Sequence, residues 1–250
     1  MISRYLEKRA LKRWSRQAMA APSARTTDLR RQAEAAKALR AQLDEVIYQA
    51  DKRLCSPQLG MVGVPRAENA DWTWRPKLWR GPLHSVGLVA VENRTPLGSE
   101  ATIFHDCDVS ELSFRQVRNL RPDDLAPYGV RMDLFRFDGT FLSVAIDFPP
   151  AAMDGLRKRH LIRVNTVVEY EKPVDIYARL NIRSGPNTEQ MNSKLPLDTE
   201  DVAVEFDLAD TDINEHRVEA LWLDLIFDGP EMNQVTVRDV NVSRAPRADI

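Results

Sequence analysis

Hydrophobic and polar residues alternate with a period of two through most of the chain after residue 87, which is typical of strands that bury one face. The clearest runs are 174–182 and 217–227, and Asp138-Gly139 between two runs is typical of a hairpin turn. Because no helical pattern separates the runs, they favour a mainly β fold, an antiparallel β-sandwich of the jelly-roll type. We expect ten strands, at about 87–92, 100–105, 109–115, 130–138, 141–148, 161–170, 174–183, 202–208, 217–227 and 233–243.

The N-terminal segment has a different pattern, because its apolar residues recur every three or four positions. The spacing predicts one helix from Ile2 to about Ala20 and a second, capped by Thr26 or Thr27, to about Leu54. The first helix has a thin apolar stripe among many basic residues, which suits a helix at an interface. The second could form a coiled-coil seam, pair with another helix or lie on the β domain. Homo-oligomer formation through the second helix is therefore one hypothesis.

Residues 57–86 separate these two patterns and are rich in proline and tryptophan. Between Trp72 and Trp79 the prolines interrupt any helix, and the segment is too short for a sheet of its own. We interpret it as an extended lead-in whose rings plug one edge of the β domain. The alternative is an exposed aromatic and arginine surface for stacking on a sugar or a base. The sequence thus predicts a basic helical arm (1–56), a lead-in (57–86) and a β-sandwich domain (87–250).

The charge is distributed unevenly. Residues 1–55 hold 13 Lys and Arg against 6 Asp and Glu, whereas the other residues hold 22 against 31. Such an arm suits an anionic membrane surface or an acidic protein, or it docks on its own acidic domain; we do not expect nucleic acid as a partner. Basic residues interrupt every apolar run near the N-terminus, and Cys55 and Cys107 lack CxxC spacing. We therefore expect a cytoplasmic location, at most peripheral to the inner membrane.

The outward positions of three predicted strands carry the candidate binding site. If the strands at 161–170, 174–183 and 217–227 are neighbours in one sheet, their outward side chains form one face. Aromatic rings stack on the apolar faces of a sugar ring, and planar polar groups bind its hydroxyls, so this face predicts a carbohydrate ligand. A hydrogen-bonded sheet surface without a ligand remains the alternative. The predicted binding residues are Arg163, Asn165, Tyr177, Arg179, Asn181, Trp222 and Asp224.

Catalytic and metal-binding patterns are weak. Strand alternation would place His105 and Cys107 on one face and Asp106 and Asp108 on the other, so too few ligands converge for a metal. The same two aspartates could serve glycoside hydrolysis, but paired acids are common in a chain with 37 of them. Nucleotide-binding and zinc-protease motifs do not occur. We therefore assign no catalytic residue, no cofactor and no metal.

Two segments, 180–190 and 222–233, resemble an uncharacterised alphaproteobacterial family of about this length, and the resemblance covers residues 72–250. It implies no activity and no site residues. The last predicted strand, with Arg238 and Asp239, is similar to the last strand of galactose-binding-like β-sandwich modules, which implies the same fold.

The sequence therefore predicts a non-catalytic binding module for carbohydrate or for another protein, with the arm mediating attachment or assembly. Two alternatives stay open: a glycan-active enzyme with carboxylates on the open sheet face, and an assembly scaffold that uses only the arm. An enzyme requires two carboxyl groups about 5 to 9.5 Å apart in a cleft, whereas a binder requires rings and amides without such a pair.

Overall fold

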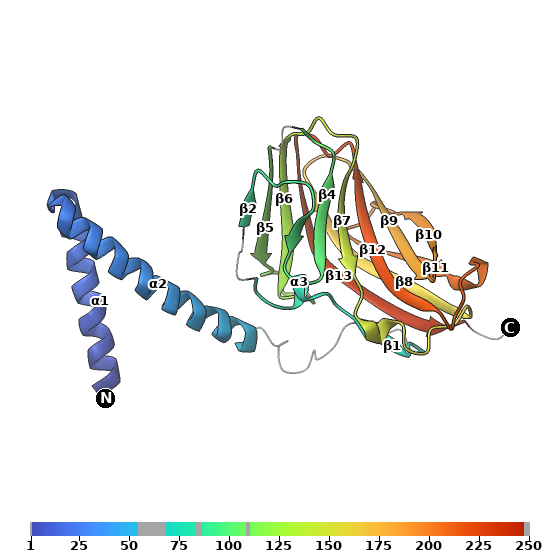
Figure 1. Ribbon diagram of the computed structural model, residues 1–250, viewed down its shortest axis with the longest axis horizontal. Helices are drawn as coiled ribbons and strands as arrows, with labels where there is room; N and C mark the ends of the chain where they lie inside the picture. Colours follow the sequence, from blue (N-terminus) through green and yellow to red (C-terminus); the bar gives the residue numbers. More distant parts are fainter. Residues whose placement is uncertain (1, 55–68, 84–86, 109–110, 248–250) are drawn as a thin grey trace. The chain divides into compact units, whose positions relative to one another are not determined.

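The computed structural model describes residues 2–54, 69–83, 87–108 and 111–247 (Figure 1). The chain divides into two compact units, Met1–Ala50 and Asp51–Ile250, and each is described by itself. The predictions that concern Cys55 and the start of the lead-in lie outside the described residues.

The first unit contains helix α1 (Ile2–Ala20), a short 3-10 helix (Ala21–Ser23) and most of helix α2 (Thr26–Leu54), and the two long helices have the bounds that the three-four spacing predicts. Pro22 separates the two helices, and Asp28 lies in the first turn of α2, where a carboxylate favours the helix dipole. Most apolar side chains of both helices are exposed. Within the described part of the chain, no helix combines the length and apolar character needed to cross a membrane.

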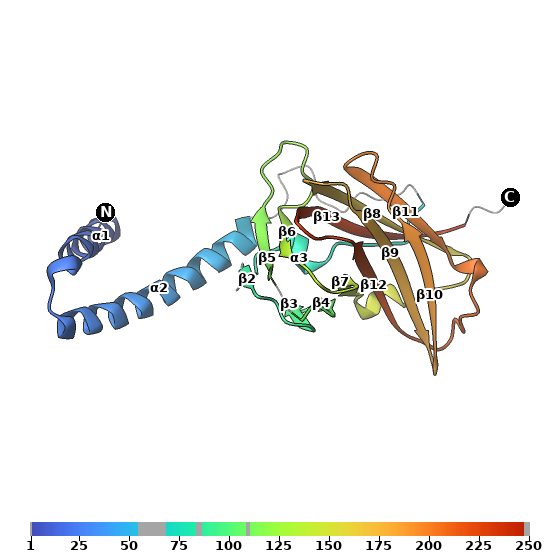
Figure 2. The ribbon, with the colours of Figure 1, turned by 90° about the horizontal axis from the view of Figure 1, so that it is seen from above.

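The second unit is an antiparallel β-sandwich whose two sheets form two layers (Figure 2). Sheet A contains β1 (Trp72–Trp74), β2 (Gly87–Val89), β5 (Glu111–Arg118), β6 (Tyr128–Arg136), β8 (His160–Tyr170), β11 (Asp201–Asp207) and β13 (Asn233–Pro246). Sheet B contains β3 (Thr95–Leu97), β4 (Ala101–His105), β7 (Leu142–Asp147), β9 (Asp175–Ser184), β10 (Asn187–Lys194) and β12 (Val218–Asp228). The strand order is β11-β8-β13-β6-β5-β2 in sheet A, with β1 also on β13, and β10-β9-β12-β7-β4-β3 in sheet B.

The hydrophobic core lies between the two sheets, because alternate residues of each strand point inward. Ile103 of β4, Met132 of β6, Leu180 of β9 and Leu223 of β12 are all buried in one continuous cluster. The period of two in the sequence therefore identifies the inward positions correctly.

The tryptophan-rich lead-in packs against this core. Trp79, in the short helix α3 (Lys77–Arg80), is 1% exposed, and its indole Nε1 donates to the Val237 carbonyl oxygen at 2.9 Å. Trp74 is 8% exposed and stacks against Trp72 with 6.2 Å between ring centroids. The rings of Trp74 and Trp79 are therefore part of the core, which excludes an exposed stacking surface at these two residues.

Some local predictions differ from the structure, for different reasons. Asp138-Gly139 is not a hairpin turn, because β6 belongs to sheet A and β7 to sheet B, so the chain crosses between layers there. Strand β10 was not expected, because it is polar and has few residues that favour strands. It pairs with β9 through the two-residue loop Gly185-Pro186, in which Gly185 has a φ of +60°.

Strand β13 is held by a buried ion pair from the lead-in. Arg75 donates from Nε and Nη2 to the two carboxylate oxygens of Asp239, both at 2.8 Å, and both side chains are buried. Asp239 follows a shift in the register of β13 on β8, between Val237 and Asp239. A bidentate pair satisfies both charged groups in a place where water does not reach them.

We predict that Arg75→Met lowers the free energy of unfolding by about 3–5 kcal/mol, because it leaves the Asp239 carboxylate buried without its cation. Arg163→Met is the matched control, because the pair of Arg163 with Glu205 is half exposed and is worth about 1 kcal/mol or less. Urea unfolding of both variants measures the difference. Equal losses in the two variants would contradict the prediction.

Candidate functional site

The seven predicted binding residues lie on two different sheets. Arg163 and Asn165 are on β8 in sheet A, whereas the other five are on β9 and β12, which are neighbours in sheet B. The expectation of one shared sheet is therefore wrong. The chain crosses from sheet A to sheet B between Tyr170 and Asp175, so β13 takes the place beside β8 that β9 was expected to fill.

The two predicted residues on sheet A already have hydrogen-bond and ion-pair partners among their neighbours. Arg163 donates from Nε to Asn165 Oδ1 at 3.0 Å and pairs through Nη1 with Glu205 at 3.1 Å. Asn165 donates in turn to Asn241 Oδ1 at 3.1 Å. This pair fits the alternative of a hydrogen-bonded sheet surface.

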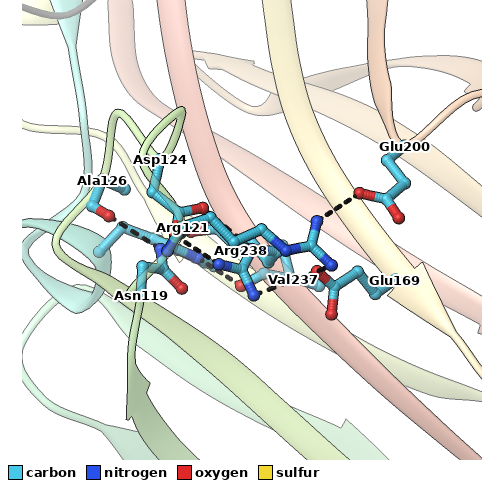
Figure 3. A network of polar contacts seen from close by, with 9 residues as sticks. Asn119, Arg121, Asp124, Ala126, Glu169, Glu200, Val237 and Arg238 are labelled. Atoms are coloured by element: carbon cyan, nitrogen blue, oxygen red, sulfur yellow. Dashed lines mark hydrogen bonds and ion pairs between the residues drawn. The ribbon is translucent and has the colours of Figure 1, made fainter.

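The same sheet carries a larger ion-pair network, which Figure 3 shows. Glu169 accepts ion pairs from Arg121 Nη2 at 2.6 Å and from Arg238 Nη1 at 3.1 Å. Arg121 also binds Glu200 at 2.7 Å, and Arg238 forms a two-point pair with Asp124. These cations and carboxylates neutralise one another, so this part of sheet A offers little unsatisfied charge to a ligand.

A second cluster on sheet A is satisfied in the same way. Asp133 accepts hydrogen bonds from Ser113, Arg115, Arg131 and Gln234 at 2.8–3.1 Å. Burial opposes ionisation of this carboxyl group, but the hydrogen bonds from Arg131, Arg115 and Ser113 outweigh it and hold the pKa of Asp133 below its ordinary value.

Sheet B presents a different outward face, which we call the platform. It consists of the outward side chains of β10, β9, β12 and β7, and the strand registers arrange them in rows. The first row is Gln190, Asn181, Trp222 and Asp147; the second is Asn192, Arg179, Asp224 and Ala145; the third is Lys194, Tyr177, Ile226 and Ser143.

Two of the predicted residues form the buried centre of the platform. Asn181 is 0% exposed and Asp224 is 4% exposed. Asp224 Oδ2 accepts from Asn181 Nδ2 at 2.9 Å and from Arg179 Nε and Nη2 at 2.9 and 2.8 Å. Asn181 Oδ1 accepts from Gln190 Nε2 at 3.0 Å. Asn181 and Asp224 are thus positioning residues that orient Arg179 and Gln190.

The two aromatic rings of the platform are half buried and lie in different rows. Trp222 is opposite Asn181, and Tyr177 is opposite Ile226, so the rings are four residues out of register. At about 3.3 Å per residue this offset is about 13 Å along the strands. Lys194 Nζ lies 5.9 Å from the centroid of the Tyr177 ring. The rings therefore flank an extended surface instead of closing one pocket.

The residues predicted to bind did not include Gln190, Asn192 and Lys194 of β10 or Asp147 of β7, which also lie on the platform. Strand β10 has polar residues on both faces, so it lacks the alternation that identified its neighbours. The available signal was the tight loop at Gly185-Pro186, because a two-residue loop after a strand implies an antiparallel partner.

The carboxyl group of Asp147 is electrostatically unusual. Loss of hydration raises the pKa of Asp147 above its ordinary value, and the negative charge of Asp224 raises it further. Asp147 is opposite Trp222, and Asp224 is the next outward residue along β12, so the two carboxyl groups are diagonal neighbours on one face.

A cleft of about 570 Å³ lies at the end of sheet B next to the platform. Its lining comes from the end of β8, the start of β9, and the ends of β10 and β12. Lys194 belongs to both the platform and the cleft, and its Nζ binds Asp175 at 2.6 Å. The residues that line the cleft are Tyr170, Pro173, Val174, Asp175, Lys194, Leu195, Leu197, Asp228 and Gly229.

The His105 to Asp108 segment forms a local turn. His105 Nε2 contacts the Val91 carbonyl oxygen at 2.9 Å, and Nδ1 accepts from the Cys107 backbone N–H at 3.2 Å. Asp106 accepts from the backbone and hydroxyl of Thr140. In the described ranges, no group of three or more His, Cys, Asp or Glu side chains is placed to hold a metal ion.

Comparisons with known proteins identify a family of unknown function and distant structural similarities. A family model described as a family of unknown function (DUF6478) matches residues 1–250. No curated protein matches the chain.

Three solved structures illustrate the structural likeness. The enzymatically active domain of bacteriophage CBA120 tailspike protein 4 has a TM-score of 0.42 at 6% identity, over 57% of this chain and 19% of that one. The CBM22-1 xylan-binding domain of Paenibacillus barcinonensis Xyn10C has a TM-score of 0.41 at 7% identity, over 74% of this chain and 100% of that one. The family 11 carbohydrate-binding module of Clostridium thermocellum, in complex with a mixed-linked tetrasaccharide, has a TM-score of 0.37 at 8% identity, over 66% of this chain and 99% of that one. The chain thus spans about a fifth of the tailspike structure.

We predict that Asp224→Asn lowers the pKa of Asp147 toward its ordinary value, because it removes the neighbouring negative charge but not the loss of hydration. Carboxyl ¹³C NMR titration of Asp147 measures the midpoint. Asp228→Asn, on the same strand, is the control and leaves the midpoint unchanged. A wild-type midpoint in the Asp224→Asn variant would show that the two carboxyl groups do not interact.

Proposed function

Because the chain belongs along its whole length to the family of unknown function DUF6478, we propose a function from its own geometry: a non-catalytic module whose platform binds a carbohydrate chain. The observation that carries this proposal is the buried Asn181–Asp224 pair. It fixes Arg179 and Gln190 in place between two half-buried rings.

The polar groups of the platform suit sugar hydroxyls. Arg179 supplies a planar set of donors, whereas Gln190 and Asn192 each supply a donor and an acceptor. Because Asp224 and Asn181 already hold Arg179 and Gln190, these side chains lose little conformational freedom when a ligand binds. Preorganised planar groups of this kind favour recognition of a hydroxylated ring.

The rings determine the shape of the ligand. Trp222 and Tyr177 are half buried, so part of each ring is exposed and can stack on the apolar face of a sugar unit. Because they are about 13 Å apart along the strands, one monosaccharide does not reach both. The platform therefore suits an oligosaccharide or polysaccharide that lies along β9 and β12.

Burial of Asp224 argues against hydrolysis by the Asp147–Asp224 pair of the platform. A glycosidase needs two accessible carboxyl groups, one on each side of the bond that is cleaved. Asp147 is accessible, but Asp224 is 4% exposed and its Oδ2 accepts from Arg179 and Asn181. Asp224 therefore supports the platform instead of attacking a substrate.

We predict that the protein binds at least one glycan on an array, and that Trp222→Ala and Tyr177→Ala each weaken that binding about ten-fold or more through loss of ring stacking. Phe135→Ala is the matched control, because Phe135 is an exposed aromatic residue of β6 in the other sheet. Titration calorimetry with the array hit measures the affinities. Equal affinity of the wild type and the two platform variants, or no glycan bound at all, would refute the proposal.

For the arm we propose attachment to an anionic surface through α1. Leu6, Ala10, Trp14 and Ala18 follow one another at intervals of four and share one side of this helix. The set Lys8, Lys12 and Arg16 has the same spacing but is displaced by two residues, so it lies on the opposite side. A helix with one apolar and one basic side binds in the headgroup region of an anionic bilayer.

Self-association through α2 is the competing hypothesis for the arm. Leu39, Leu43, Val46 and Ile47 are all exposed on this helix. Their three-four spacing fits a coiled-coil seam between two copies of the chain. Attachment and assembly use different helices, so one experiment can separate them.

We predict that the full chain sediments with vesicles that contain phosphatidylglycerol but not with pure phosphatidylcholine vesicles. Trp14→Glu places a charge on the apolar side of α1 and reduces the bound fraction about ten-fold. Met19→Glu makes the same charge change at an exposed position near the basic side and reduces it less. Equal binding to both vesicle types would refute the proposal, and so would a dimer by sedimentation equilibrium that binds no vesicle.

A further inference from the structure

The platform continues without a break into the cleft at the end of sheet B. The row of paired residues that follows Tyr177 and Ile226 is Asp175 and Asp228, which are directly opposite each other on β9 and β12. Both aspartates line the cleft. A chain that lies along β9 and β12 over Trp222 and Tyr177 therefore reaches the cleft next.

The cleft has the size and construction of a small-molecule subsite. Its volume of about 570 Å³ is in the range of ordinary ligand pockets, about 300–1,000 Å³. Val174 and Leu195 supply a buried apolar part of the lining. The Tyr170 hydroxyl donates to the Leu197 carbonyl oxygen at 2.9 Å, which fixes the ring at the wall.

The connection between the two sheets closes the sandwich at this end. Asn233 accepts from the Lys172 backbone N–H at 3.0 Å and donates to the Lys172 carbonyl oxygen at 2.8 Å. These bonds hold the connection between Tyr170 and Asp175, which contributes Pro173 to the cleft. The wall is therefore braced by the β12–β13 turn, and the cleft suits the last unit of a chain.

The charges in the cleft do not balance. Lys194 binds Asp175 at 2.6 Å, and this hydrogen bond raises the pKa of Lys194 above its ordinary value, so the amine stays charged. Asp228 adds a second carboxylate, and none of the described residues donates a hydrogen bond to it. One ammonium group thus serves two carboxylates, which leaves the cleft with a net negative charge.

We infer that the cleft binds the terminal unit of the carbohydrate chain and selects a unit with a free, protonated amino group. In this arrangement the amino group binds the Asp228 carboxylate, and the hydroxyls bind Lys194 and Asp175. An ammonium group forms an ion pair as well as a hydrogen bond with Asp228, whereas the uncharged amide N–H of an N-acetylated unit forms only the hydrogen bond. This inference rests on the proposed function, because it takes the platform to hold the rest of the chain.

The test compares two probes that differ in the acetylation, and therefore in the charge, of their amino groups: a hexasaccharide of β-1,4-linked glucosamine and its fully N-acetylated counterpart. Titration calorimetry is performed with the full chain at a pH at which the amines are protonated. We expect the wild type to bind the glucosamine hexasaccharide at least ten-fold more tightly. Asp228→Asn abolishes this difference, whereas Asp201→Asn, the same change on β11 of sheet A, preserves it.

Three outcomes overturn the inference: equal affinity of the wild type for the two probes, no binding of the glucosamine hexasaccharide, and equal losses for both probes in Asp228→Asn. The Trp222→Ala variant distinguishes a failure of the amine preference from a failure of the proposal that the platform binds carbohydrate. If the wild type binds the N-acetylated probe and Trp222→Ala weakens that binding, the platform stands while the amine preference falls. Refutation of the platform itself comes from the array, which does not depend on Asp228.

Discussion

The buried pair of Arg75 and Asp239 is the interaction on which the sandwich depends. Asp239 lies in β13, the strand that pairs with β8, β6 and β1, so its position fixes the register of most of sheet A. A carboxylate at this depth is tolerated only with its cation in place, because removing one partner of a buried ion pair leaves an uncompensated charge. The cation comes from the lead-in, outside the long strands, and it anchors Trp74 and Trp79 against the core at the same time. A segment without much regular structure of its own is thus a structural part of the domain.

The two outward faces use polar residues in opposite ways. On sheet A, arginine and carboxylate side chains pair with one another, as at Glu169 and Asp133, so the face is stable and largely neutralised. On sheet B, Asn181 and Asp224 are buried beneath their neighbours on the outward face, and they hold Arg179 and Gln190 in place. This contrast, within the described residues, is the physical reason for placing the binding surface on sheet B. Side chains that hydrogen-bond to one another, as on sheet A, have few donors and acceptors left for a ligand. Side chains that are held in place but still have exposed donors and acceptors, as on sheet B, can bind one.

Periodicity in the sequence was sufficient for the helices and for the inward face of each long strand, but it could not identify strand neighbours. The alternation in 174–182 correctly places Tyr177, Arg179 and Asn181 on one side, yet it contains no information on whether β8 or β12 lies beside them. That choice depends on where the chain changes layer, and the crossing between Tyr170 and Asp175 has no strong turn signal. Strand β10 was missed for a different reason: it is an edge strand, and of its inward residues only Met191 is apolar, whereas Glu189 and Ser193 are polar. The platform residues contributed by β10 therefore required the structure.

The uneven distribution of charge along the chain is consistent with the two proposed binding functions. The arm carries an excess of seven positive charges, and the remaining residues carry an excess of nine negative charges. An anionic surface attracted to α1 is repelled by the acidic sandwich, and a chain that ends in an ammonium group is attracted to the cleft but repelled by the arm. The opposite charges of the arm and the sandwich therefore prevent each from binding the partner of the other. Specificity then comes from repulsion of the wrong partner as well as from contacts with the right one. Because long-range repulsion is screened within about 10 Å at 0.1 M salt, this separation weakens at high ionic strength, whereas the stacking on Trp222 and Tyr177 does not. The balance between the two contributions sets how strongly the protein distinguishes charged from neutral glycans.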